Sequence, residues 1–315
     1  MQSVLADSSN YPDDDASALR RRLAQLHGVR PEQILVTGGL TECLGMLART
    51  FLTRGLNAIT SERSFIVYRI ATRAAGAQLI EVPMRQHSYD LRAIATAVNR
   101  DTRLIFMANP NNPTGTVVSA DEVDHLVRQI PERVVVVLDE AYYEYAAHFA
   151  AMRAAKYSAS LDYVREGRNV VVLRTFSKVH GLAGLRVGYG IATAELMTRI
   201  LSQRSMYGVS TLAQAAALAA LDDGAHIRRA VQNNADQSER LAHALSDLQC
   251  GTVPTWANFL YCQPGQDVTK LAARLALEGI AVRPLGPWGA PQAVRITIGR
   301  PEQNDALLNA LRKLR

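Results

Sequence analysis

Cysteine is scarce in this sequence, which argues against a disulfide framework and against a cysteine-ligated metal site. The 315 residues include three cysteines, Cys43, Cys250 and Cys262, which are widely separated. An odd number of cysteines at these spacings fits neither a disulfide framework nor a metal-ligand motif. We therefore interpret all three as buried, reduced thiols, and we predict no metal site.

Long apolar runs and targeting signals are also absent from the sequence. No stretch approaches the ~20 apolar residues that a membrane-spanning helix requires. The N-terminal stretch MQSVLADSSNYPDDD has neither the basic start nor the apolar core of a signal peptide. We expect a cytoplasmic protein with no membrane partner.

The charge pattern lacks a basic stripe of the kind that binds nucleic acid. The formal net charge is +6, from 35 Lys and Arg against 29 Asp and Glu, but the basic residues are scattered. Their densest cluster, at residues 20–22, falls in a helix-like pattern without interleaved aromatic residues. We interpret this cluster as a solvated helix face, and we expect no nucleic-acid partner.

The composition and patterning that are present are typical of a globular α/β protein. Hydrophobic residues make up 48% of the chain and charged residues 20%, and the length suggests one large domain and a smaller one. Short apolar runs alternate with helical patterns, which predicts a mostly parallel central sheet covered by helices. The runs lie at residues 34–37, 58–60, 78–82, 104–107, 134–138 and 170–173.

The pattern changes toward the C-terminus. After residue 190 the chain is mainly helical to about residue 248, and short strands and helices then alternate. The strands are predicted at residues 259–262, 280–283 and 294–298, and the helices at 268–277 and 303–314. This pattern predicts a small C-terminal α+β domain. We therefore predict an N-terminal segment and helix at residues 1–30, a large domain at 31–250 and a small domain at 251–315.

A valine-rich run and the residues after it carry the clearest chemical signal. The predicted strand at residues 170–173 is followed by Thr175, Ser177 and Lys178, and Arg186 follows among glycines. Open α/β sheets bind ligands at the carboxyl ends of their strands, and hydroxyls with an arginine are common phosphate partners. A lysine held in a cavity can lose its proton and attack an aldehyde. Pyridoxal 5'-phosphate contains both an aldehyde and a phosphate, so Lys178 is either the lysine that binds this cofactor or a solvated surface lysine.

Three other strand ends show weaker signals of the same kind. A glycine turn after residues 34–37 leads through Leu40 and Thr41 into a helix whose N-terminus suits a phosphate, although any tight turn can use glycine. Residues 108–115, ANPNNPTG, form either a rigid loop or a loop that presents amide donors, with Asn112 among them. Asp139, after residues 134–138, is either a helix cap or a ligand to a positive group.

Four motifs together resemble a known enzyme family. ANPNNPTG, LDEAYYEY, RTFSKVHGLAGLRVGYG and VRITIGR stand in the order and spacing of the fold-type I aminotransferases, most closely the histidinol-phosphate aminotransferase family. The resemblance covers the chain from Tyr11 onward. It implies a pyridoxal-phosphate-dependent enzyme that moves an amino group between a donor and a 2-oxo acid such as 2-oxoglutarate. The implied donor is an amino acid or an amino-alcohol phosphate, either aromatic or similar to histidinol phosphate.

The resemblance also implies a role for each matching residue at the cofactor. Lys178 corresponds to the lysine that forms the Schiff base and then moves the Cα proton, and Asp139 corresponds to the acid that pairs with the pyridine nitrogen. Tyr142 and Asn112 correspond to the two donors to the phenolic oxygen of the ring. Phe65 stands where the family has an aromatic ring over the cofactor, usually tyrosine. The phosphate cradle corresponds to Thr175, Ser177, Arg186 and the backbone at Leu40 and Thr41.

Three further correspondences concern the substrate and a partner subunit. Arg295, in VRITIGR, corresponds to the arginine that clamps the α-carboxylate of the substrate. Arg283 matches a position near the distal group of the substrate, where a phosphate is bound in histidinol-phosphate enzymes. Tyr11 stands in the place of a tyrosine that reaches the cofactor phosphate from the neighbouring subunit. The resemblance therefore implies a homodimer with shared active sites.

A departure at the N-terminus leaves other functions open. Ten residues precede Tyr11, whereas family members carry a longer N-terminal arm that helps to close the substrate site and contributes to the small domain or the dimer contact. The same cofactor serves decarboxylases, oxidases and cyclases on this scaffold. A cofactor-binding protein without turnover is a third possibility. Formation of glutamate that depends on 2-oxoglutarate would favour amino transfer over these alternatives.

Overall fold

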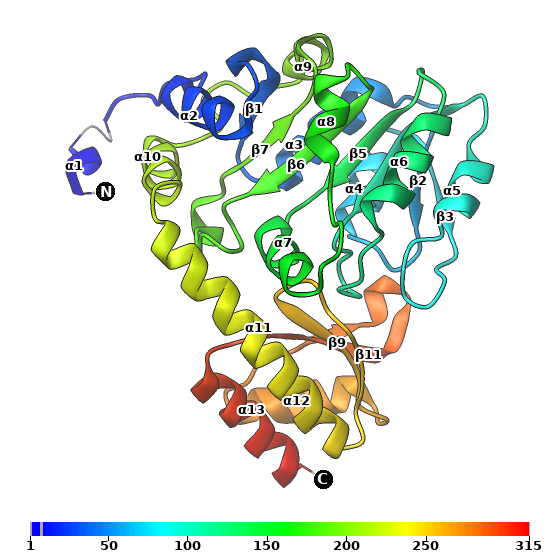
Figure 1. The fold of residues 1–315 in the computed structure, drawn as a ribbon, viewed down its shortest axis with the longest axis vertical. Coiled ribbons are helices and arrows are strands. Elements are labelled where there is room, and N and C mark those ends of the chain that lie inside the picture. Colours follow the sequence, from blue (N-terminus) through cyan, green and yellow to red (C-terminus); the bar gives the residue numbers. More distant parts are fainter. Residues whose placement is uncertain (1, 7–8, 315) are drawn as a thin grey trace.

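A seven-stranded sheet forms the centre of the larger part of the molecule (Figure 1). The computed structural model describes residues 2–6 and 9–314. The strand order is β1-β7-β6-β5-β4-β2-β3; β7 runs antiparallel to both of its neighbours, and the other neighbouring pairs are parallel. The predicted α/β fold with a mostly parallel sheet is therefore confirmed. The strands are β1 (Ile34–Thr37), β2 (Asn57–Ser61), β3 (Gln78–Val82), β4 (Thr102–Ala108), β5 (Val135–Asp139), β6 (Val170–Thr175) and β7 (Gly188–Ile191).

Strand β7 is not predicted by the sequence pattern, because its residues, GYGI, alternate with glycine. The structure explains these glycines by close approach. A Cβ atom on Gly188 would lie 3.1 Å from the Leu40 side chain and 3.2 Å from the Arg174 carbonyl oxygen. A Cβ atom on Gly190 would lie 3.4 Å from the Leu173 side chain. The small residues let β7 lie between β1 and β6, directly beside the helix that follows β1.

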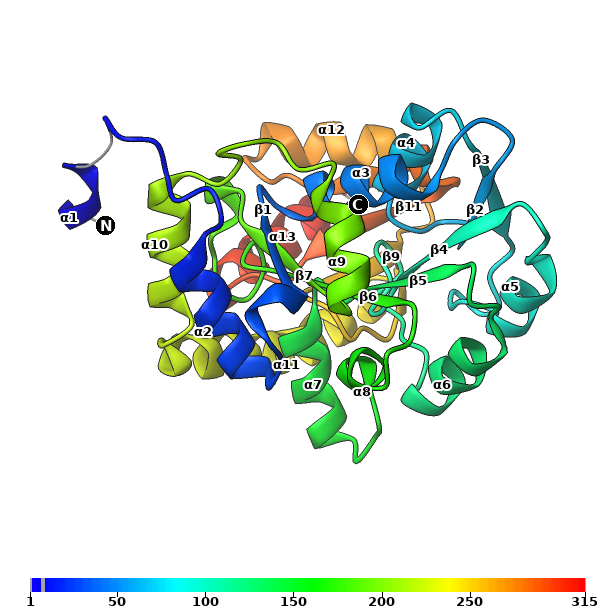
Figure 2. The ribbon, with the colours of Figure 1, turned by 90° about the horizontal axis from the view of Figure 1, so that it is seen from above.

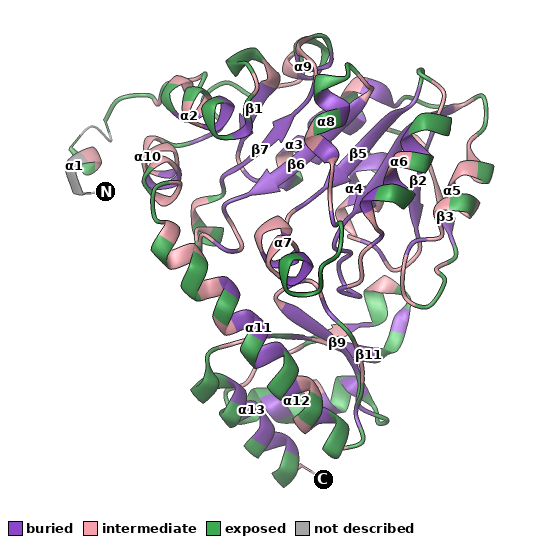
Figure 3. Ribbon diagram, in the orientation of Figure 1, coloured by how far each residue is buried: buried purple, intermediate pink, exposed green. Residues whose placement is uncertain are grey.

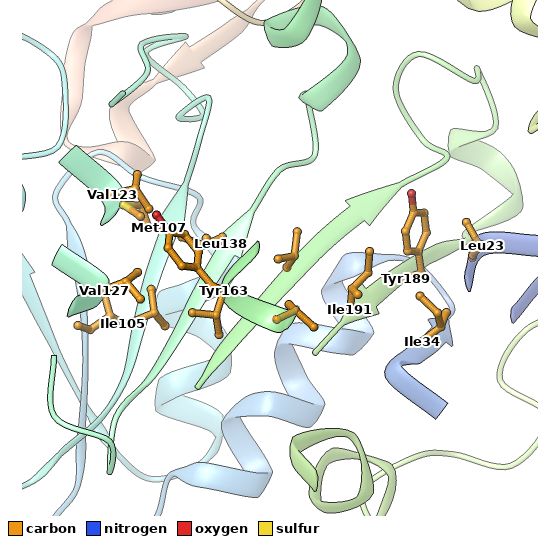
Figure 4. Close-up of a cluster of buried hydrophobic side chains, with 14 of the residues drawn as sticks. Leu23, Ile34, Ile105, Met107, Val123, Val127, Leu138, Tyr163, Tyr189 and Ile191 are labelled. Atoms are coloured by element: carbon orange, nitrogen blue, oxygen red, sulfur yellow. The ribbon is translucent and has the colours of Figure 1, made fainter. Parts of the chain in front are cut away.

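Helices cover both faces of the large sheet, as Figure 2 shows for α3 and α4 on one side and α5, α6 and α8 on the other. The strands between them are mostly buried, apart from the edge strand β3 (Figure 3). Figure 4 shows Leu23 lying near Ile34 and Tyr189 in one of the two cores. Full burial of such side chains contributes roughly 1.5–3 kcal/mol each, so the strand ends stand on a rigid platform. The helices up to residue 220 are α1 (Gln2–Leu5), α2 (Ser17–His27), α3 (Leu40–Phe51), α4 (Val67–Ala74), α5 (Leu91–Ala97), α6 (Ala120–Gln129), α7 (Tyr143–Met152), α8 (Ser160–Arg165), α9 (Ala194–Leu201) and α10 (Thr211–Ala220).

A four-stranded antiparallel sheet lies below the large sheet in Figure 1, in the order β10-β11-β9-β8. Its outer face forms a separate core with α12, α13 and the C-terminal part of α11. These elements are α11 (Gly224–Asp247), β8 (Gly251–Val253), β9 (Phe259–Gln263), α12 (Val268–Leu277), β10 (Arg283–Leu285), β11 (Ala290–Thr297) and α13 (Pro301–Lys313). The predicted α+β character of this region is confirmed.

One predicted strand is misplaced in the small sheet. The sequence favours a strand at residues 280–283, but β10 begins at Arg283. Ile280 and Val282 instead pack as loop residues against the core of the small sheet, which explains why an apolar pattern occurs without strand pairing. Among the described residues, no helix is both long enough and apolar enough to cross a membrane.

Candidate active site

A cavity of about 180 Å³ lies at the carboxyl ends of β4, β5 and β6. The last residues of these strands, Ala108, Asp139 and Thr175, all form part of its wall. The structure also brings together here every cofactor-binding residue predicted from the sequence except Tyr11. These lining residues are Leu40, Thr41, Phe65, Asn112, Asp139, Tyr142, Thr175, Ser177, Lys178 and Arg186.

Asp139 is a buried acid, with 3% of its surface exposed. One carboxylate oxygen accepts a hydrogen bond from the Tyr68 hydroxyl at 2.9 Å, and the other accepts one from the Ala141 N–H at 3.2 Å. Burial raises the pKa of Asp139 to about 6, and the two hydrogen bonds and the charge of Lys178 offset only part of this rise. Because the ionised form is costly to bury, this carboxylate favours a positively charged group beside it.

Lys178 places its amine in the same cavity. The amine nitrogen lies 5.1 Å from the centre of the Tyr142 ring. Tyr142 is itself buried and packs edge-on against Phe259 of β9, with ring centres 5.2 Å apart. The amine and the Tyr142 ring thus belong to a part of the cavity that adjoins the four-stranded sheet.

Another part of the wall presents hydrogen-bond donors to an anion. Helix α3 begins at Leu40, so its first backbone N–H groups face the cavity end of β1. The Ser177 N–H donates to the Thr175 hydroxyl at 3.1 Å, and Arg186 donates to the Ser177 hydroxyl at 3.4 Å. Gly39, before the helix, has a φ of 87°, and a Cβ atom there would lie 2.4 Å from the Arg186 guanidinium. Glycine therefore lets the guanidinium reach the helix N-terminus, which is a favourable setting for a phosphate.

Arg295 and Arg283 are not among the residues that line the cavity, but Arg295 contacts one of them, Asn112. The Arg295 guanidinium donates to the Asn112 side-chain oxygen at 2.6 Å, and its Nε atom is buried without a hydrogen-bond partner. Arg283 stands directly opposite Arg295 in the β10–β11 ladder. Residues in this relation have Cα atoms about 4.5–5.5 Å apart and side chains on the same face of the sheet. The two arginines therefore share one face of the small sheet, with Arg295 hydrogen-bonded to Asn112 and Arg283 exposed to solvent.

Tyr11 is not among the residues that line the cavity. Its side chain is 80% exposed and stacks on Tyr207, with ring centres 4.6 Å apart. Met206, next to Tyr207 in the sequence, is 71% exposed. The predicted cofactor contact of Tyr11 is thus not made within its own chain.

Two contacts below the cavity are not predicted by the sequence. Tyr68, on α4, donates to Asp139 and stacks on Phe106 with ring centres 5.0 Å apart. Arg174 and Glu140 form an ion pair at 2.8 Å, with side chains 7% and 3% exposed. Each member of this pair is the chain neighbour of a predicted site residue, and that adjacency is the one signal in the sequence that points to them.

The family relationship follows from comparison with known proteins. The model of the family described as aminotransferase class I and II matches residues 6–311. The chain belongs to this family. Histidinol-phosphate aminotransferase 1 of Idiomarina loihiensis is 38% identical over 318 residues, which cover 100% of this chain and 84% of that protein.

Solved structures of aminotransferases and related enzymes share the fold. Histidinol-phosphate aminotransferase from Sinorhizobium meliloti, in complex with pyridoxal-5'-phosphate, has a TM-score of 0.90 at 28% identity, covering 100% of this chain and 86% of that chain. L-threonine-O-3-phosphate decarboxylase from Porphyromonas gingivalis has a TM-score of 0.86 at 26% identity, covering 99% and 93%.

The chain is therefore a pyridoxal-phosphate-dependent aminotransferase, as the four sequence motifs predict. As a member of this family, it acts between an amino compound and an oxo acid. The chemical groups that line the cavity match those that the cofactor of this family needs. The cavity combines a phosphate-binding surface, a buried acid for a cationic ring nitrogen, an amine for the aldehyde and the aromatic side chain of Phe65.

Proposed function

We propose that this aminotransferase takes its amino group from histidinol phosphate, or from a donor of similar shape such as an aromatic amino acid, and passes it to 2-oxoglutarate. The observation that carries the proposal is the pair Arg283 and Arg295, opposite each other in one ladder beside the cavity. Histidinol phosphate has a phosphate ester on the carbon where an amino acid has its carboxylate. Two arginines at opposite positions on one face of the sheet suit the extra negative charge of that phosphate. The 38% identity with a histidinol-phosphate aminotransferase supports the same donor.

The cofactor would be held by the residues that line the cavity. Arg186, Ser177, Thr175 and the N-terminus of α3 would bind its phosphate, and Asp139 would accept the proton of its ring nitrogen. When bound, pyridoxal phosphate supplies an aldehyde that joins to amines and an electron-poor ring that stabilises negative charge on the substrate Cα. In return, a positive ring nitrogen would offset the cost of burying the Asp139 charge.

Hydrogen bonds at the other side of the cavity would orient the ring oxygen. The side-chain oxygen of Asn112 accepts from Arg295, which leaves its amide nitrogen to donate in another direction. The Tyr142 hydroxyl is the second donor of this pair. The arrangement links the substrate arginine to the ring through a single side chain.

Lys178 would transfer the proton. With the donor amine joined to the cofactor, the Lys178 amine would be free to take the proton from the substrate Cα and to pass it to a carbon of the cofactor. Arg295 holds the carboxylate of glutamate in one half of the cycle, and Arg283 joins it to hold the phosphate in the other half. The two halves therefore share Arg295, and Arg283 acts in the phosphate half alone.

The exposed surface at Tyr11 is the part of the chain where we propose that a second subunit binds. Its stacked partner Tyr207 and the neighbouring Met206 are exposed as well, which is typical of a surface covered by a second chain. We place Tyr11 at the cofactor phosphate of the partner subunit in a homodimer. The division at residues 30 and 250 into an N-terminal segment, a large domain and a small domain is part of the same proposal.

The test is a donor screen with the purified holoprotein. Histidinol phosphate, tyrosine, phenylalanine and other amines are supplied with 2-oxoglutarate, and glutamate is measured together with carbon dioxide and oxygen uptake. The proposal predicts glutamate formation with histidinol phosphate or an aromatic amino acid as the best donor, and a loss of roughly a thousandfold or more for Lys178→Ala. Release of carbon dioxide, oxygen uptake, or an unrelated amine as the best donor would overturn it.

A further inference from the structure

The two arginines of the anion pair belong to a longer row on the small sheet. Arg283, Arg295 and Tyr261 occupy matching positions on β10, β11 and β9. Their neighbours Val294 and Leu260 face the opposite side and fill the core of the small sheet. The row therefore faces the large sheet. Its side chains bound the space between the two sheets next to Asn112.

A strained turn of the large sheet meets this row at Tyr261. The ring of His87 lies 5.2 Å from the Tyr261 ring, and the His87 Nδ1 atom is buried without a hydrogen-bond partner. Gln86 and His87 have φ values of 51° and 65°, and Arg85 and Ser88 exchange backbone hydrogen bonds around them. A hairpin turn with two positive φ values normally contains Asn and Gly, so this sequence accepts strain. Backbone strain of this kind is concentrated at ligand sites.

Arg63 approaches the same place from the loop that precedes Phe65. It too has a positive φ, 51°, and its carbonyl oxygen accepts a hydrogen bond from Asn111 at 3.1 Å. Its guanidinium has one ion pair, to Glu62 at 3.7 Å, and its Nε atom is buried without a hydrogen-bond partner. With Phe65 and Trp288 it lines a recess between the large and small sheets.

The positive charge of Arg63 affects the ionisation of both His87 and Tyr261. Burial lowers the pKa of His87, and the positive charge of Arg63 lowers it further. Burial raises the pKa of Tyr261, and the same guanidinium opposes that rise. Arg63 is therefore close enough to both rings to influence their ionisation. A hydrogen-bonded chain joins the two strained segments: Asn111 donates to Thr114, which contacts Thr116, which donates to the His87 carbonyl.

We propose that Arg63 and His87 form the outer part of a phosphate subsite and that they distinguish a phosphate donor from a carboxylate donor. The inference rests on the proposed function, because it concerns the same donor. A phosphate ester extends one carbon and one oxygen farther from Cα than a carboxylate does. It would pass Arg295 and meet donors from the large sheet, whereas a carboxylate would stop at Arg295. Arg63 and His87 then contribute to only one of the two half-reactions.

The experiment compares two ligands that lack an amine and cannot react, propyl phosphate and butyrate. Their binding to the holoprotein is measured by calorimetry, and the single half-reactions with histidinol phosphate and with glutamate are followed by cofactor absorbance. The variants are Arg63→Gln, Arg63→Lys and His87→Asn. Arg73→Gln is the matched control, because Arg73 is an exposed arginine on the neighbouring helix α4. Thermal midpoints show that each variant is folded.

Arg63→Gln is expected to weaken propyl phosphate binding and the histidinol phosphate half-reaction by roughly 10- to 100-fold, the effect of losing one charge-assisted hydrogen bond. Butyrate binding and the glutamate half-reaction should change less than about twofold, Arg63→Lys should recover part of the loss, and the control should match the wild type. Equal propyl phosphate binding in Arg63→Gln and the wild type would overturn the inference, whatever the true donor is. Phosphate binding that depends on Arg63, without turnover of histidinol phosphate, would support the subsite and overturn the proposed donor.

Discussion

Replacing Asp139 by asparagine in the cofactor-free protein measures the cost of burying this carboxylate. The pKa of Asp139 is raised from 3.8 to about 6 by burial, and two pKa units correspond to about 3 kcal/mol of stability. The sign follows from proton binding. Between these two pKa values the folded state binds more protons than the unfolded state, so the wild type loses stability as pH rises through this window. Asparagine has no charge and avoids this loss.

The assay is urea unfolding of both cofactor-free proteins between pH 4.5 and pH 8. The advantage of Asp139→Asn over the wild type should grow by about 2 kcal/mol across this range and level off above pH 7. An asparagine amide that lacks acceptors costs about 1 kcal/mol at every pH, which shifts the whole curve but not its slope. In the holoproteins the order should reverse, because the variant loses the charge partner of the ring nitrogen. A stability difference that does not change with pH would refute the burial argument.

Three further predictions concern groups around the cavity. Gly39→Ala should destabilise the protein by about 1–3 kcal/mol, because the backbone there has a φ of 87°. It should also raise the dissociation constant of the cofactor, because the new Cβ atom would meet Arg186. Unchanged cofactor affinity would count against the phosphate cradle. Glu140→Gln should lower the free energy of unfolding by about 3 kcal/mol in urea titration, because Arg174 would remain buried without its anion. A loss below about 1 kcal/mol is typical of an exposed ion pair and would show that this pair is hydrated. Tyr68→Phe should raise the pKa of Asp139 further, since the ionised acid loses a donor. The pH dependence of unfolding would not change if that hydrogen bond were absent.

Much of the cavity is predictable because apolar runs locate strand ends. Asp139 and Thr175 end β5 and β6, and parallel strands bring their carboxyl ends to one edge of the sheet. Motif resemblance then adds Asn112 and Phe65, which lie on loops whose path no periodicity reveals. For this reason the lining of the cavity agrees with the residues expected from sequence.

The remaining contacts depend on tertiary packing that the sequence does not encode locally. Tyr68 looks like any apolar residue of an amphipathic helix until the fold sets it against Asp139. Strand β7 has no apolar pattern in the sequence, because Leu40 and Arg174 lie so close to its backbone that glycine is needed there. Arg63 and His87 carry no motif, and the role that we propose for them rests on their backbone angles and on the contact of His87 with Tyr261.

The most direct test of the central claim is to find which lysine bonds to the cofactor. The chain has four lysines, Lys156, Lys178, Lys270 and Lys313, so peptide mapping after borohydride reduction of the holoprotein is unambiguous. The account predicts that the reduced cofactor is attached to Lys178, the lysine that lines the cavity with Asp139. Attachment to any of the other three lysines, or an unmodified Lys178 in a fully loaded protein, would contradict it.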